Sequence, residues 1–165
     1  MFTDERRADW VGAACRLPPG SLVVVRGRSA GERAALAEAL CGIAPLLIAG
    51  DERLAARVGA AGLHLPQARM AEAMHWRARH PGWIITASVH SLGAMARARE
   101  VDALFLSPVF PTASHPGAPS LGAARAAFIA AAAPAPVYAL GGVTARNAAL
   151  LAPSFSGIAA IGALL

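Results

Sequence analysis

The chain has 165 residues, 56% of them hydrophobic, which is enough for one domain with a sizeable core. Its formal net charge is +5, but the 15 basic residues, all arginine, are spread along the chain without a basic run or interleaved aromatic residues. This distribution disfavours a nucleic-acid-binding surface. A membrane span is also disfavoured, because Pro134, Pro136 and Gly141-Gly142 interrupt the most apolar region.

The N-terminal segment is charged where a signal peptide requires an apolar core. Cys15 and Cys41 are too few and too unpatterned for a disulfide framework or a zinc site. We therefore expect a cytoplasmic protein with one domain over residues 1–165, and neither a membrane nor a nucleic acid as partner.

Short apolar runs alternate with helical patterns along the chain. Strands are expected at 22–26, 45–48, 62–65, 83–88, 103–106, 137–140 and 157–161. Helices are expected at 6–15, 29–41, 53–59, 68–79, 92–100, 121–133 and 145–151. Continuous apolar strands flanked by helices are typical of a parallel sheet covered on both faces. A helix after nearly every strand favours an α/β fold of the TIM (β/α)8 barrel type over an open sheet. The absence of Gly-x-Gly-x-x-Gly after the first strand weakens the dinucleotide-binding alternative.

Both ends of the chain are short for such a barrel, which usually exceeds about 200 residues. Residues 1–4 resemble the end of a truncated first strand, and no room for an eighth helix remains after residue 161. Two interpretations stay open. Either the start site lies upstream, or the barrel is trimmed and a partner subunit covers its open seam, as a homo-oligomer would.

In a parallel barrel the functional site is built at the carboxyl ends of the strands. Two arginines spaced by one residue can clamp a phosphate, and a glycine pair lets backbone amides approach an anion. The sequence therefore predicts a small-molecule site that recognises phosphate. The candidate phosphate- or substrate-binding residues are Arg26, Arg28, Asp51, Gln67, Ser88, Thr112, Ser114, His115, Gly141, Gly142 and Gly162.

Three residues at these strands have a more specific interpretation. Asp51 either binds a metal or substrate, or caps the helix that follows it. His64 lies within an apolar strand, which favours a hydrogen-bonded core histidine. His90 lies between a strand and a helix, where its ring is accessible. Because histidine exchanges a proton near neutral pH, we expect His90 to act as a general acid or base.

Seven segments together resemble the thiamine phosphate synthase/TenI superfamily, in the family's order and at its spacing. They are residues 47–51, 62–67, 88–91, 107–114, 119–122, 140–144 and 157–161. The resemblance spans nearly the whole chain and implies a barrel fold, a role in thiamine biosynthesis and a phosphorylated thiazole as the small-molecule partner.

The synthase branch of this family joins a pyrimidine pyrophosphate to a thiazole phosphate with magnesium. The resemblance implies that Thr112, Ser114 and Arg28 face the pyrophosphate. It also implies that Gly141-Gly142 and the loop after Ile161 hold the thiazole phosphate.

The same resemblance makes Asp51 one magnesium ligand, but the family's second aspartate corresponds to Arg69. Magnesium prefers oxygen ligands, so a guanidinium at this position argues against the synthase. Val24, Gly50 and His115 also depart from the synthase pattern. We expect Arg69 to lie near Asp51 and to form a salt bridge with it.

The tautomerase branch moves a proton to aromatise a thiazole carboxylate phosphate without a metal. The segment 88–91 resembles the catalytic-histidine segment of that branch, which implies that His90 is the acid/base residue. We therefore predict a TenI-like thiazole tautomerase, an isomerase without a cofactor, whose site residues share one mouth of the barrel. Two alternatives stay open: a magnesium-dependent thiamine phosphate synthase, and a non-catalytic phosphate-ligand binder or regulatory remnant.

Overall fold

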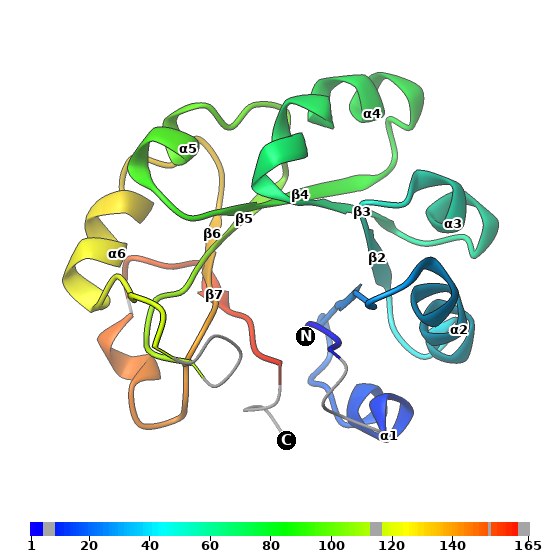
Figure 1. Ribbon diagram of the computed structural model, residues 1–165, viewed down its shortest axis with the longest axis horizontal. Coiled ribbons are helices and arrows are strands. Elements are labelled where there is room, and N and C mark those ends of the chain that lie inside the picture. The colour runs from blue at the N-terminus through cyan, green and yellow to red at the C-terminus, as the bar shows by residue number, and fades with distance from the viewer. Residues whose placement is uncertain (5–8, 113–116, 152, 162–165) are drawn as a thin grey trace.

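The computed structural model describes residues 1–4, 9–112, 117–151 and 153–161. Within them, seven parallel strands form one sheet in chain order, each paired with the next. The strands are Val23–Val25 (β1), Leu46–Ala49 (β2), Gly62–Leu65 (β3), Ile84–Val89 (β4), Ala103–Leu106 (β5), Val137–Ala139 (β6) and Gly157–Ile158 (β7). The sheet curls into a ring, which confirms the expected shortened TIM-type barrel (Figure 1).

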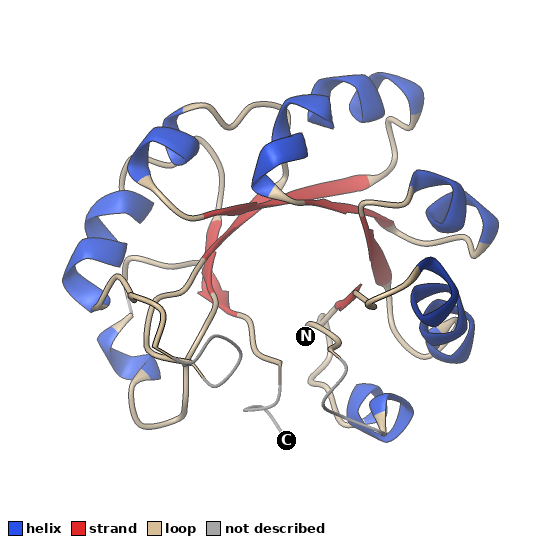
Figure 2. Cartoon of the chain, in the orientation of Figure 1, coloured by secondary structure: helices blue, strands red, loops and turns tan. Residues whose placement is uncertain are grey.

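Helices cover the outer face of this ring (Figure 2). They are Trp10–Cys15 (α1), Ala30–Leu40 (α2), Glu52–Arg57 (α3), Ala73–Arg79 (α4), Leu92–Ala96 (α5) and Ala123–Ala130 (α6), with 3-10 turns at Gln67–Glu72 (η1) and Ala148–Leu150 (η2). Leu46, Leu47 and Ile48 of β2 are all buried, because their strand packs on helices outside and on the barrel interior inside. No helix within the described ranges is long and apolar enough to cross a membrane.

Three expected elements are corrected by the structure. The helix expected at 68–79 is divided into η1 and α4, and the strand expected at 157–161 is reduced to Gly157–Ile158. The helix expected at 145–151 is the single turn η2. Its first turn competes with a side chain, since Asn147 accepts a hydrogen bond from the Thr144 N–H (2.7 Å) and donates to the Gly142 carbonyl (2.9 Å).

Residues 1–4 complete the ring of strands, as the expected truncated first strand would. Phe2 forms a parallel bridge with Val24 of β1, and the Thr3 N–H donates to the Val24 carbonyl (3.0 Å). On its other side the Phe2 N–H donates to the carbonyl of Ala160, just past β7 (3.0 Å). A short segment thus bridges the first and last strands of the sheet.

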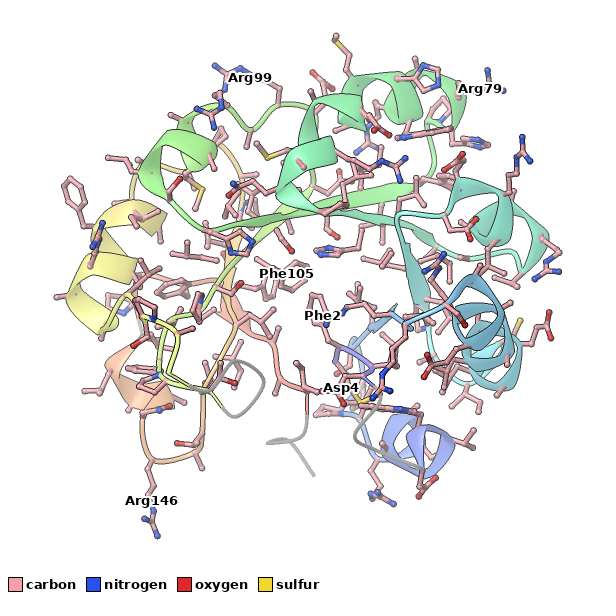
Figure 3. All side chains as sticks on the ribbon, in the orientation of Figure 1. Phe2, Asp4, Arg79, Arg99, Phe105 and Arg146 are labelled. Carbon is pink, nitrogen blue, oxygen red and sulfur yellow. The ribbon has the colours of Figure 1, made fainter. Side chains whose placement is uncertain are left out.

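An aromatic cluster fills the barrel interior. Phe2 and Phe105 point toward one another inside the ring, whereas Arg79, Arg99 and Arg146 point outward (Figure 3). The Phe2 and Phe105 rings meet edge to face with centroids 4.9 Å apart, and each also contacts the His64 ring, at 5.1 and 5.4 Å. Such pairs stabilise the core beyond the area that they bury.

His64 is the buried, hydrogen-bonded core histidine that its strand predicts. The Thr86 hydroxyl donates to the Leu63 carbonyl, so it accepts from His64 Nδ1–H (3.0 Å), and Nε2 accepts from the Ser88 hydroxyl (2.9 Å). Burial, aided by the nearby Arg26 guanidinium, lowers the pKa of His64 from 6.5 to about 3. The imidazole is therefore neutral inside the barrel.

This depressed pKa predicts an acid-sensitive fold. The unfolded chain takes up the His64 proton below pH 6.5 and the folded chain does not, so acidification favours unfolding. Between pH 7 and pH 5 this group alone should remove about 2 kcal/mol of stability. Chemical denaturation of wild type and His64→Gln across that range measures the effect, with the amide variant lacking this component. An equal pH dependence in both proteins would contradict the assignment.

Candidate active site at the carboxyl edge of the barrel

The candidate residues that the structure describes follow the carboxyl ends of successive strands. Ser88 is the exception, because it lies within β4, next to the last residue of that strand. Cross-strand hydrogen bonds connect several of them into a rim. The Gln67 side chain, after β3, accepts from the His90 N–H after β4 (2.8 Å), and the His90 ring contacts Ser107 after β5. His90, Gln67 and the loop after β5 therefore share one mouth of the barrel, as expected.

The exposed His90 ring has a fixed tautomer when neutral. Its Nδ1 lies 2.8 Å from the Ser107 carbonyl oxygen and 3.3 Å from the Ser107 hydroxyl. Because a carbonyl only accepts, Nδ1 carries the hydrogen. Nε2 then holds a lone pair, and it makes no hydrogen bond with any described residue. The ring thus presents a proton acceptor at the mouth.

The glycine pair packs tightly against the loop after β5. The Phe110 N–H donates to the Gly141 carbonyl (3.0 Å), and a Cβ added to Gly142 would lie 2.3 Å from the Pro111 carbonyl oxygen. Gly142 also has φ +65°, which favours glycine. Thr112, one residue beyond Pro111, is half-buried beside this turn. The close approach brings two candidate phosphate-binding segments together.

Backbone donors at this turn remain available. In the described part of the chain, the N–H groups of Gly141, Gly142 and Val143 donate to no other group. The helix expected after this turn is only the single turn η2, and the Thr144 N–H donates to the Asn147 side chain. Three successive N–H groups are therefore available as donors for an anion.

The two candidate arginines after β1 have different surroundings. The Arg26 guanidinium carbon lies 6.0 Å from the centre of the Phe2 ring, a cation–π distance at the top of the barrel interior. The Arg28 N–H, by contrast, donates to the Glu32 carboxylate (2.7 Å) at the start of α2. Arg26 therefore faces the inside of the mouth and Arg28 belongs to its rim.

Asp51 is the N-cap of α3, the structural alternative that the sequence left open. One carboxylate oxygen accepts from the Leu54 N–H (3.0 Å) and the other from Arg33 Nη2 (3.2 Å). The backbone hydrogen bond first, and then Arg33, hold the pKa of Asp51 below its usual value. Both oxygens are thus engaged within the protein.

Arg69 lies near Asp51, but the expected salt bridge between them is wrong. Its Nε and Nη2 donate to the two oxygens of Glu72, each at 2.7 Å, and its Nη1 donates to the Gly50 carbonyl (2.7 Å). Glu72 is the nearer acid because it stands three residues away on the same turn, η1. Asp51 is paired with Arg33 instead.

Magnesium, which the family resemblance implies, does not fit these residues. Asp51 has no second carboxylate beside it from position 69, and its own oxygens bond to Leu54 and Arg33. The described residues contain no group of three or more histidine, cysteine, aspartate and glutamate side chains able to hold a metal.

Several site residues differ from the sequence-based picture. Ser88 faces the barrel interior and bonds to His64, so its hydroxyl supports the core. Ser114, His115 and Gly162 lie outside the described residues. Arg33 and Glu72 were not predicted as site residues from the sequence. Their position in the first turns after a strand end could have indicated them, because long side chains there reach neighbouring loops.

Comparisons with known proteins agree with this architecture. A family model described as thiamine monophosphate synthase matches residues 3–164. The thiamine-phosphate synthase of Parasynechococcus marenigrum (strain WH8102) is 37% identical over 124 residues, covering 73% of this chain and 36% of that protein. The putative thiamine-phosphate synthase 2 of Aquifex aeolicus (strain VF5) is 37% identical over 101 residues, covering 60% of this chain and 54% of that protein.

The chain thus spans between about a third and just over half of the curated relatives that it matches. Among solved structures, a thiamine phosphate pyrophosphorylase from Pyrococcus furiosus superposes with a TM-score of 0.76 at 24% identity, over 97% of this chain and 83% of that chain. This likeness supports the fold. The match of the family model over almost the full length places this chain in the thiamine monophosphate synthase family, confirming the resemblance noted in its sequence.

Proposed function

We propose that this chain binds a phosphorylated thiazole at the carboxyl edge of its barrel and catalyses a proton transfer on it, as a TenI-like tautomerase. The observation that carries the proposal is the His90 ring, whose Nδ1–H is held by the Ser107 carbonyl while Nε2 is left as a base. A phosphate-binding position and one acid/base group suffice for this reaction.

In the proposed mechanism, Nε2 of His90 takes a proton from a carbon of the non-aromatic thiazole ring. The resulting imidazolium keeps its Nδ1–H bond to the Ser107 carbonyl, which stabilises the positive charge. The same ring then returns a proton to a second position of the substrate, so the product is an aromatic isomer. Proton number and charge balance without any cofactor.

The free amides of Gly141, Gly142 and Val143 support a phosphate position one strand further along the rim. Arg26 adds a positive charge at the mouth from the opposite side of the ring. Both features favour an anionic ligand whose ring would lie above the interior cluster, within reach of His90.

A second candidate is thiamine phosphate synthesis, and the names of the relatives favour it over the tautomerase. Against it stand Arg69 in place of the family's second aspartate and the engagement of Asp51 by Arg33. Formation of thiamine phosphate from the two phosphorylated precursors with magnesium would establish the synthase and remove our proposal.

Removing the His90 imidazole should abolish most of the reaction. General acid–base catalysis contributes of order 10² to 10⁴-fold, so His90→Ala should lose about that factor in turnover. Proton NMR of the non-aromatic thiazole carboxylate phosphate in EDTA follows the aromatisation directly. Binding without turnover in the wild type, unaffected by His90→Ala, would support the non-catalytic binder.

Gln67 should act as a positioning residue for His90, since its side-chain oxygen accepts the His90 N–H. Gln67→Ala removes that acceptor and should lower kcat with a smaller change in KM. Gln67→Glu keeps an oxygen acceptor and should retain most of the activity. If both variants lose kcat equally, the hydrogen bond to His90 does not orient the ring.

The Gly142 turn should tolerate no side chain. Gly142→Ala combines a left-handed φ with a contact of 2.3 Å to the Pro111 carbonyl, so the loop must move. We expect a stability loss of roughly 1–3 kcal/mol and weaker binding of inorganic phosphate by calorimetry. Gly59→Ala, also at positive φ but with open space around its Cβ position, is the matched control. Unchanged phosphate binding in folded Gly142→Ala would exclude this turn as the anion site.

A further inference from the structure

We infer that the barrel edge between β2 and η1 is closed to divalent cations by a guanidinium–carboxylate network, so that the mouth takes a phosphomonoester and no magnesium-bound pyrophosphate. The network consists of Arg33, Asp51, Glu52, Arg69 and Glu72. The inference rests on the proposed function only for the assignment of a phosphorylated ligand to the mouth. It restricts that ligand to phosphomonoesters.

The Arg69 guanidinium is partly exposed, but several hydrogen bonds hold it in place. Three of its donors are engaged at 2.7 Å, two with Glu72 and one with the Gly50 carbonyl, and Glu52 lies 3.8 Å away. The bidentate bond to Glu72 raises the pKa of Arg69 above its already high ordinary value and lowers that of Glu72. Arg69 therefore remains positively charged.

Arg69 donates a hydrogen bond to the carbonyl of Gly50, the residue directly before Asp51. A divalent cation coordinated by Asp51 would lie close to this guanidinium, and like charges repel strongly in a partly desolvated site. Arg33 approaches Asp51 from the other side, with Nη2 at 3.2 Å. Asp51 is therefore flanked by two permanent cations, which makes a third cation at this carboxylate unfavourable.

Gly50 and Arg69 form one structural unit. Gly50 has φ +62°, and a Cβ at this position would stand 3.2 Å from Arg69 Nη1. A larger residue would be strained there and would crowd the guanidinium. The glycine at position 50 therefore leaves room for the Arg69 guanidinium.

The network also leaves no positive charge for a second phosphate. Its two guanidiniums are matched by the three carboxylates of Asp51, Glu52 and Glu72. A pyrophosphate arriving without a metal would meet an edge on which three carboxylates outnumber two guanidiniums, and it would have to displace the ion pairs between them. The free amides at Gly141–Val143, on the other side of the mouth, suit one phosphate group.

Direct cation titration tests the inference without any turnover. Calorimetry of the wild type with Mg²⁺ should give no saturable heat, and Mn²⁺ should cause no selective broadening of the Leu54 amide signal, the N–H that Asp51 accepts. Inorganic pyrophosphate should bind no more tightly in Mg²⁺ than in EDTA. Saturable one-to-one binding of Mg²⁺ with broadening at Leu54 would overturn the inference, whatever the outcome of the tautomerase assay.

A gain-of-binding variant provides the converse test. Arg33→Met/Arg69→Asp removes both cations and restores a carboxylate, so Mg²⁺ should bind at least roughly tenfold more tightly than to wild type. Arg33→Met/Arg69→Asn removes the same two cations without adding a carboxylate and should gain less affinity than the Asp variant. Circular dichroism checks that both variants are folded. If neither folded variant binds Mg²⁺ more tightly than the wild type, the two arginines do not exclude the cation and the inference is overturned; the wild-type titration decides alone if either variant does not fold.

Discussion

Parallel pairing of every strand with its neighbour is the constraint on which the candidate site depends. In such a sheet all strands run the same way, so the residues that follow them collect at one edge. Here seven strands pair in chain order, and Phe2 links Val24 to Ala160 to complete the ring. Gln67, His90 and Ser107 come together only because β3, β4 and β5 end side by side. Their hydrogen bonds then fix the rim without any further element.

The interior of the ring explains why that edge can be rigid. Phe2, His64 and Phe105 pack edge to face, and the neutral His64 uses both ring nitrogens on hydroxyls of β4. Every polar group in this part of the core is thus satisfied, which is the condition for burying it without a large cost.

The sequence predicted the strands well because their apolar runs are continuous and each is followed by turn residues. It also placed Asp51, His90 and the glycine pair at the correct edge, since that follows from the strand ends alone. It could not predict which carboxylate pairs with Arg69, because the long arginine side chain can reach both Glu72 on the same turn and Asp51 across the rim. Nor could the sequence predict the hydrogen bond between Ser88 and His64. The short helix after Thr144 was also not predictable, because there the hydrogen bonds of one asparagine side chain compete with those of the helix.

The two halves of the mouth differ in how they respond to substitution, and this bears on how one family can support different chemistry. The proposed phosphate position consists of backbone amides at a glycine turn, which most side-chain changes leave intact. The opposite edge is built from charged side chains, and there Arg69 pairs with Glu72. A side-chain substitution at that edge can therefore change the ions that it accepts while leaving the backbone amides in place. His90 is held by the Ser107 carbonyl after β5 and by the side chain of Gln67, the first residue of η1, so its position is linked to the edge that carries Arg69.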